Sequence, residues 1–132
     1  MAAESDRVRR FLEDDLAECR AEDVETRLTE LDMLASTARR DSVQGDVAVL
    51  STLGNETRYR LVRALVEANG QLCVCELNPV VDVSESAVSH ALSDLHEAGL
   101  VTRQRDGRWR KYSATETATA LLSALEAVRD DE

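Results

Sequence analysis

The dipeptide Asp106-Gly107 is the feature that most restricts how this chain can fold. It separates two strand-like segments, Leu100–Arg105 and Arg108–Ser113. An Asp-Gly pair between such segments is a strong signal for a tight β-hairpin, because both central residues of the turn must tolerate positive φ. The sequence therefore predicts a hairpin over residues 100–113, which we name the wing.

The wing is rich in arginine. A two-residue turn at this dipeptide places Arg105 opposite Arg108 and Arg103 opposite Arg110, so that four arginines share one face. Like charges in direct cross-strand register destabilise a hairpin, so stability does not explain the pattern. A charged edge strand that resists aggregation is the simpler interpretation. However, the segment holds five basic residues and one acid in a chain of net charge −10, which favours DNA phosphates as its partner.

A helix, a short turn and a second helix precede the wing. The apolar spacing predicts a short helix over about residues 74–81 and a longer one over Glu85–Ala98. Ser84 is suited to cap the second helix, because its hydroxyl can accept a backbone N–H. Two helices joined by three or four residues are typical of a helix-turn-helix.

The second of these helices has an outer face of small and polar residues. Its apolar residues Val88, Leu92 and Leu95 recur at helical spacing and turn inward. Small hydroxyl-bearing side chains allow close approach to a groove and can contact bases or phosphates. The candidate DNA-binding residues are therefore Ser84, Ser86, Ala87, Ser89 and His90 on this helix, and Arg103, Arg105, Arg108, Arg110 and Lys111 in the wing.

Helical spacing also organises the two ends of the chain. It predicts two helices, or one kinked helix, over about residues 5–38, with Cys19 on the apolar side. Further helices are expected to end at Gly54 and to span about residues 56–69 and 115–129. The last helix is expected to bury apolar residues that include Ala118, Leu121, Leu122, Leu125 and Val128.

Together these elements predict a mainly α chain with a small β-hairpin, an α+β fold, arranged as a winged helix-turn-helix. Residues 1–40 are expected to form an N-terminal helical extension that serves dimerisation or metal binding. Residues 41–132 are expected to form the DNA-binding domain, including a C-terminal dimerisation helix.

The composition indicates the salt conditions and the cellular compartment in which the protein works. Acids outnumber bases 26 to 16, and Lys111 is the only lysine. Acidic surfaces stay hydrated at high salt, so we interpret the chain as halophilic; an ordinary acidic protein from a GC-rich genome is the alternative. No uncharged stretch exceeds nine residues, which excludes a transmembrane helix, and the N-terminus has no secretory pattern. We expect a cytoplasmic protein with no membrane partner.

Four stretches, in order and suitably spaced, resemble the arsenic-repressor (ArsR/SmtB) family of winged-helix metal sensors. They are Leu53–Val62, Gln71–Leu77, Ser84–Leu92 and Leu95–Val101, and the likeness covers about residues 45–128. The resemblance implies a homodimeric repressor that binds double-stranded operator DNA and dissociates when an inducer binds. Each subunit would place the helix of residues 84–98 in a major groove and the wing on the flanking backbone.

The segment around Cys73 and Cys75 resembles the metal-binding box of the arsenic and cadmium/lead branches. One ion that grips both cysteines must distort the first turn of the helix-turn-helix and so misplace the recognition helix. The arsenic pattern often has a third cysteine where this chain has Asn78. The cadmium/lead branch instead adds cysteines from the N-terminal region of the partner subunit, for which Cys19 is the only candidate.

The count of cysteines guides the choice of ion. Three cysteines in a cytosolic protein argue against a disulfide scaffold and for thiol or metal chemistry. Three thiolates suit As(III) or Sb(III), whereas zinc normally takes four ligands. We predict As(III) or Sb(III) as the inducer, ahead of Cd(II) or Pb(II). Burial of Cys19 in a core, with an exogenous thiol as third ligand, remains open.

Other functions also remain open. A thiol redox-responsive repressor on the same fold would oxidise Cys73 and Cys75 or bridge one of them to Cys19, although a disulfide between residues i and i+2 is strained. A constitutive repressor would carry vestigial cysteines. A thiol enzyme is the third class, but the chain has only two histidines and no glycine-rich phosphate loop. We therefore predict that the chain is not an enzyme.

Overall fold

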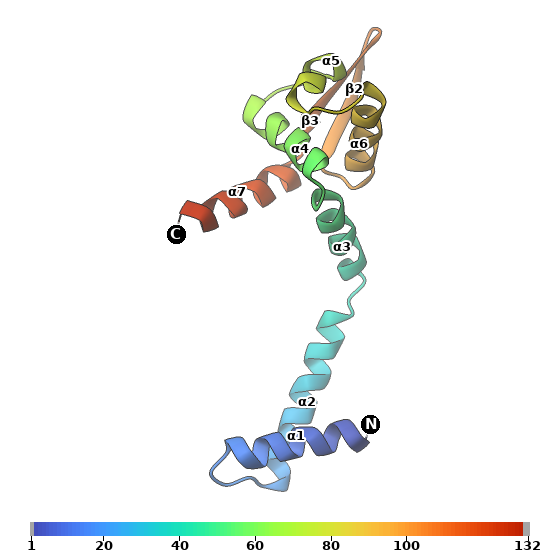
Figure 1. Cartoon of the computed structure of the whole chain (residues 1–132). Helices are drawn as coiled ribbons and strands as arrows, with labels where there is room; N and C mark the ends of the chain where they lie inside the picture. Colours follow the sequence, from blue (N-terminus) through green and yellow to red (C-terminus); the bar gives the residue numbers. More distant parts are fainter. Residues whose placement is uncertain (1, 131–132) are drawn as a thin grey trace. The chain divides into compact units, whose positions relative to one another are not determined.

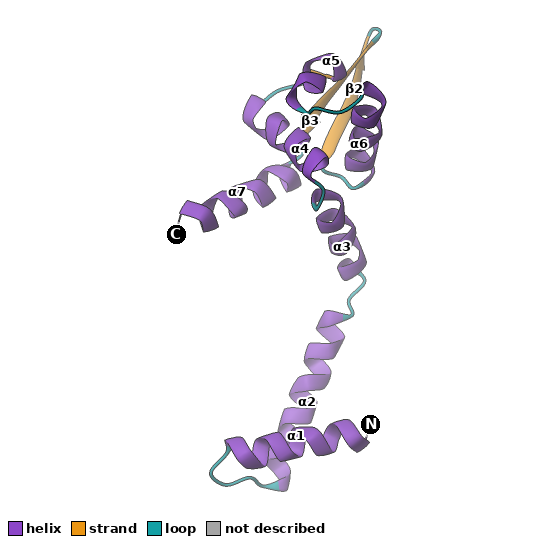
Figure 2. Ribbon diagram, in the orientation of Figure 1, coloured by secondary structure: helices purple, strands orange, loops and turns teal. Residues whose placement is uncertain are grey.

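The computed structural model describes residues 2–130 of the 132-residue chain (Figures 1 and 2). In this part, seven α-helices and one 3₁₀ helix accompany a three-stranded antiparallel sheet, which confirms a mainly α fold with a small hairpin. The elements are α1 (Ala2–Asp15), α2 (Ala21–Ala38), α3 (Ser42–Leu53), α4 (Glu56–Ala68), β1 (Leu72–Cys73), α5 (Val74–Leu77), η1 (Asn78–Val80), α6 (Glu85–Glu97), β2 (Val101–Asp106), β3 (Trp109–Ala114) and α7 (Glu116–Asp130). Among the described residues no helix has the length and apolarity needed to cross a membrane.

The chain divides into two compact units, Met1–Val43 and Gln44–Glu132. In the first unit α1 packs on α2, and Leu12 and Val24 are buried. The prediction that Cys19 lies on the apolar side of a helix is wrong, because α1 ends at Asp15 and Cys19 lies in the connecting loop. Consecutive acids at residues 13–15 explain the end of the helix, since carboxylates at a helix C-terminus oppose the helix dipole.

The core of the second unit fixes the position of α6. Val88, Leu92 and Leu95 point inward from this helix and are fully buried, as predicted. They pack in one cluster with α4, α5, the start of β2, β3 and α7, through Leu61, Val62, Leu65, Leu77, Val81, Ala91, Leu100, Val101, Tyr112, Ala118 and Leu122. The helix that carries the candidate DNA-binding residues is therefore anchored along its whole inner face.

The helix-turn-helix forms as the sequence predicts. The short first helix is α5, and Pro79 falls in the 3₁₀ turn η1 that extends it. Ser84 caps α6, because its Oγ accepts the backbone N–H of Ala87 at 3.2 Å. Gly99, with φ of +77°, follows the end of α6 and turns the chain into the wing.

The sheet has strand order β1-β3-β2, and β2 and β3 form the wing. The predicted register is wrong: Asp106 pairs with Trp109, so that Gly107 and Arg108 form the turn. Among these four residues only Gly107 has positive φ, +63°. A glycine at the first central position is the requirement of a type II′ turn, which explains why the turn moves by one residue. Strand β1 was not anticipated from the sequence.

Helix α7 is only partly covered. Ala118 and Leu122 are fully buried, and Glu126 forms an ion pair with Arg63 of α4. The predicted burial of Leu125 and Val128 does not occur within this chain, where they are 48% and 63% exposed. The described residues thus leave the distal apolar face of α7 uncovered.

Candidate nucleic-acid interface and thiol site

The N-terminal half of α6 presents a small, polar outer surface. Ser84, Ser86, Ala87, Ser89 and His90 are all exposed on this surface. The hydroxyl of Ser84 is engaged as the helix cap and lies 3.3 Å from that of Ser86. Ser86, Ser89 and His90 are therefore the exposed side chains whose polar atoms can reach a base or a phosphate, with Ser86 exchanging its contact with Ser84.

His90 belongs to a polar cluster, with Asp94 and Arg58, that the sequence analysis did not identify. Its Nε2 lies 3.8 Å from Asp94 Oδ2, one turn further along α6, and its side chain is 82% exposed. The same Asp94 oxygen lies 3.8 Å from a guanidinium nitrogen of Arg58. Arg58 Nε donates a 2.6 Å hydrogen bond to the carbonyl oxygen of Thr52 at the end of α3. Arg58 thus links the end of α3 to the outer surface of α6.

The wing gathers three of its arginines on one face. Arg105 and Arg110 are directly paired across the strands, and Arg103 faces Tyr112. Arg103, Arg105 and Arg110 are exposed and line one shallow pocket. Cationic side chains that converge in this way form a surface suited to phosphate oxygens.

Two other predicted wing residues lie apart from this cluster. Arg108 occupies the turn, and its guanidinium carbon lies 5.0 Å from the centre of the Trp109 ring. Lys111 forms a 3.0 Å ion pair with Asp106 on the opposite strand. The positive charge of Lys111 is therefore partly neutralised within the wing.

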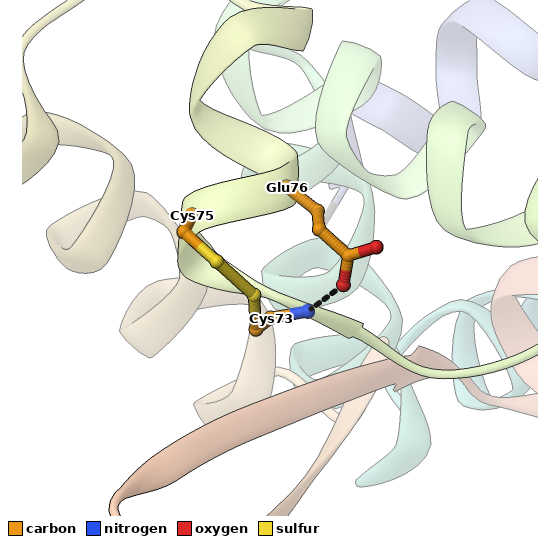
Figure 3. The surroundings of a disulfide bond; sticks show 3 residues. All are labelled: Cys73, Cys75 and Glu76. Atoms are coloured by element: carbon orange, nitrogen blue, oxygen red, sulfur yellow. Dashed lines mark hydrogen bonds between the residues drawn. A yellow bond between two sulfur atoms is a disulfide. The ribbon is translucent and has the colours of Figure 1, made fainter.

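The two cysteines of the predicted metal box lie side by side. Cys73 ends β1 and is buried, whereas Cys75 is exposed in the first turn of α5. Their sulfur atoms are joined as a disulfide, with 5.4 Å between the Cα atoms (Figure 3). The count of cysteines argued against a disulfide scaffold, and the structure differs, because the strand-to-helix turn brings the two side chains together. Glu76 Oε1 accepts the backbone N–H of Cys73 at 3.0 Å and braces this turn.

One pocket connects the cysteine pair to the predicted DNA-binding residues. Its volume is about 250 Å³. Cys73 and Cys75 line it together with Ser89 and Glu85 of α6 and with Arg105, Arg108, Trp109 and Arg110 of the wing. A ligand on the sulfur atoms would therefore lie between the recognition helix and the wing.

The donor set of this pocket fits a soft ion only in part. Once reduced, Cys73 and Cys75 supply two adjacent thiolates, the ligands that soft ions prefer. Among the described residues no three His, Cys, Asp or Glu side chains gather in a metal-binding arrangement. The third position of the arsenic pattern is Asn78, whose Oδ1 is buried without a hydrogen-bond partner. The role of Cys19 as a ligand stays a prediction.

Known proteins are similar to this chain in sequence and in fold. Residues 55–103 match the family described as bacterial regulatory protein, arsR family. The putative arsenical resistance operon repressor ArsR of Halobacterium salinarum is 50% identical over 125 residues, which are 95% of this chain and 97% of that protein. The cadmium resistance transcriptional regulatory protein CadC of Listeria innocua is 37% identical over 71 residues, 54% of this chain and 56% of that protein.

A solved structure shows the same fold at lower identity. It is the homodimeric winged helix-turn-helix DNA-binding domain of a possible ArsR-family regulator from Mycobacterium bovis. The TM-score is 0.62 at 21% identity, and the match covers 70% of this chain and 89% of that one. The expected winged helix-turn-helix is thereby confirmed. Since it is 50% identical, over 95% of its length, to a putative arsenical resistance operon repressor, the chain belongs to the arsR family of bacterial regulatory proteins.

Proposed function

We propose that this protein is a metalloid-responsive repressor that binds operator DNA as a homodimer and is released when As(III) or Sb(III) binds its cysteine thiolates. The observation that carries the proposal is the shared pocket, in which Cys73 and Cys75 adjoin Ser89 of α6 and the arginines of the wing. The putative arsenical resistance operon repressor that is 50% identical to the chain supports the choice of metalloid.

DNA binding is proposed from two surfaces, those of α6 and of the wing, that would contact different parts of the DNA. The first offers exposed Ser86, Ser89 and His90 for base contacts in a major groove, and the second offers Arg103, Arg105 and Arg110 for the phosphates. The proposed protein acts on DNA in the cytoplasm. Its family consists of regulators, in agreement with the prediction that the chain is not an enzyme.

The dimer is proposed from uncovered apolar side chains of the second unit. Val47 and Leu50 of α3 are 57% and 60% exposed, and Leu125 and Val128 of α7 are similarly open. Large exposed apolar groups of this kind mark protein–protein interfaces. The predicted roles of residues 1–40 as a dimerisation or metal arm belong to the same proposal.

The chemistry of release begins with reduction of the cysteine pair. Two electrons and two protons from a cellular dithiol convert the disulfide to two thiols, and the dithiol becomes a disulfide. Arsenous acid, As(OH)₃, then exchanges its hydroxyl groups for the thiols. As each As–S bond forms, the thiol proton leaves with one hydroxyl group as a water molecule. Cys73 and Cys75 supply two sulfurs, and Cys19 or an exogenous thiol supplies the third.

A redox-responsive repressor is the second candidate, because the structure holds Cys73 and Cys75 as a disulfide. In that case oxidation itself would change DNA binding. Release by Cd(II) or Pb(II) is a further alternative, and the likeness to a cadmium resistance regulator supports it. The acid excess and a relative from Halobacterium salinarum both fit a protein that works at high salt.

Fluorescence anisotropy of labelled promoter DNA from the gene's own upstream region tests these candidates. The protein is reduced with a phosphine, which adds no competing thiol, and titrated with arsenite, antimonite, cadmium and zinc. We expect arsenite and antimonite to release the DNA from the wild type but not from Cys73→Ser/Cys75→Ser. Cys19→Ser then shows whether the third sulfur is internal.

Each alternative outcome assigns a different function. Release by an oxidant, without an effect of any metal, would establish the redox-responsive repressor. Tight binding that neither oxidant nor metal disturbs would refute sensing and leave a constitutive repressor. A lack of DNA binding at every salt concentration would refute the proposed function altogether.

A further inference from the structure

We propose that arsenite ligation releases DNA by displacing the wing, while α6 stays in place. The inference rests on the proposed function and concerns the route from the cysteine pair to the DNA. The sequence alone suggested the opposite route, through a misplaced recognition helix.

The first argument is that one cysteine belongs to the sheet that carries the wing. Cys73 is the last residue of β1, where it pairs in antiparallel register with Lys111 of β3. Lys111 directly follows Arg110, one of the three clustered arginines. A shift of the Cys73 backbone therefore acts on the β1–β3 hydrogen bonds next to an arginine of the wing.

The second argument concerns how Cys73 is held. The carboxylate of Glu76 accepts its backbone N–H at 3.0 Å, so the strand end and the first turn of α5 form one braced unit (Figure 3). An ion that draws Cys73 and Cys75 into its own bond geometry must move the backbone on both sides of this brace. One of those sides is α5 and the other is the sheet.

The third argument is that fewer buried side chains hold the wing than hold α6. Helix α6 is anchored in the core by Val88, Leu92 and Leu95, none of which is exposed. In the wing, by contrast, β2 is exposed at every residue after Val101, and Tyr112 is the only buried residue of β3. Because side chains in the core are closely packed, the element with fewer buried side chains moves more easily, and this element is the wing.

The lining of the pocket also supports displacement of the wing. Four wing residues line it beside the cysteines, against two residues of α6. Trp109 and Arg108 lie at the wing tip, and Figure 1 shows this tip extending beyond the helices of the second unit. An arsenic atom bound to both sulfurs thus adds bulk directly against the wing.

Two double variants distinguish displacement of the wing from displacement of α6. For the wild type and each variant, the measured quantity is the operator Kd with arsenite divided by the operator Kd without it. Arg105→Gln/Arg110→Gln removes wing contacts, and Ser89→Ala/His90→Ala removes α6 contacts. If arsenite acts by displacing the wing, DNA contacts already absent from the wing cannot be lost again. We therefore expect the first variant to lower the ratio at least fivefold and the second to keep it within twofold, although both bind more weakly than the wild type.

The opposite pattern, in which the α6 variant loses the response and the wing variant keeps it, would overturn the inference and leave the proposed function intact. Equal loss in both variants would also overturn it, because both elements would then move. If the wild type itself is not released by arsenite, the proposed function fails first.

A second measurement needs no DNA and uses the full-length wild-type chain. Amide hydrogen exchange reports local opening of the backbone. Arsenite should accelerate exchange in residues 109–114 of β3 at least threefold, while residues 88–95 of α6 stay unchanged within twofold. Faster exchange in α6 with an unchanged β3 would refute the displacement of the wing.

Discussion

The direct pairing of Arg105 with Arg110 predicts a conflict between stability and DNA binding. The two residues are direct cross-strand partners, line the same pocket and are both exposed. Like charges at directly opposed positions destabilise an antiparallel pair by about 0.2–1 kcal/mol. Replacing Arg105 by glutamine should therefore raise the free energy of unfolding by about 0.5 kcal/mol at 0.1 M KCl.

Salt separates this effect from other causes. The Debye length falls from about 10 Å at 0.1 M to about 3 Å at 1 M ionic strength, so the gain from Arg105→Gln should nearly vanish at 1 M KCl. Urea is the suitable denaturant, because it leaves the ionic strength unchanged. Arg9→Gln, which removes an exposed arginine from α1, is the matched control and should not reproduce the gain.

Operator binding should change in the opposite direction. Loss of one phosphate contact in each subunit lowers the slope of log K against log salt by about 1.8 for the dimer. Hydrogen bonds to charged groups contribute about 1.5–3 kcal/mol each, so Arg105→Gln should weaken binding at least tenfold, about 1.4 kcal/mol, at 0.1 M KCl. Fluorescence anisotropy measures both quantities. If Arg105→Gln lowers stability at 0.1 M KCl, the repulsion between Arg105 and Arg110 is refuted. If it binds DNA with the same slope as Arg9→Gln, the assignment of this pair to phosphates is refuted.

Four further substitutions test the fold that positions the site, each by urea unfolding of the full-length chain. Leu92→Ala removes a fully buried side chain from α6 and should cost about 2–5 kcal/mol; a loss below 1 kcal/mol would contradict its core position. Ser84→Ala removes the cap of α6 and should cost about 1 kcal/mol, most of which Ser84→Asp should restore. Gly107→Ala forces a side chain into a turn with φ of +63° and should destabilise the chain by about 1 kcal/mol. Gly45 lies inside α3, where an added Cβ meets nothing within 4 Å beyond the adjacent residues and the backbone of its own helix, so Gly45→Ala should stabilise the chain by about 0.5–1 kcal/mol. Equal signs for the two glycine variants would contradict this account.

The helix-turn-helix could be predicted because its signals are local. Ser84 as a cap and the inward spacing of Val88, Leu92 and Leu95 are properties of one helix, and the structure confirms them. The end of α1 before Cys19 was also locally encoded by the acids at residues 13–15. The apolar spacing alone would extend this helix to Cys19, but the unfavourable charge at its C-terminus ends it at Asp15.

The register of the wing could not be predicted in the same way. The expected and observed registers differ by two residues along one strand. A shift of two keeps each side chain on its own face of the sheet, so the pattern of apolar residues is identical in both registers. The choice depends on the turn at Gly107 and on the pairing of β3 with β1. With only two residues, β1 carries no periodicity that a sequence could reveal.

The position of β1 also unites the two proposed chemistries of the cysteine pair. A sulfur atom in the Cys73–Cys75 disulfide is not a thiolate and cannot bind arsenic in that form. Oxidation and arsenite ligation therefore exclude one another at this site. Both reactions would nevertheless take place at the same strand end, where Cys73 pairs with Lys111 beside the arginines of the wing. Because the proposed response to a metalloid needs both thiolates, reduction of the disulfide determines whether that response can occur at all.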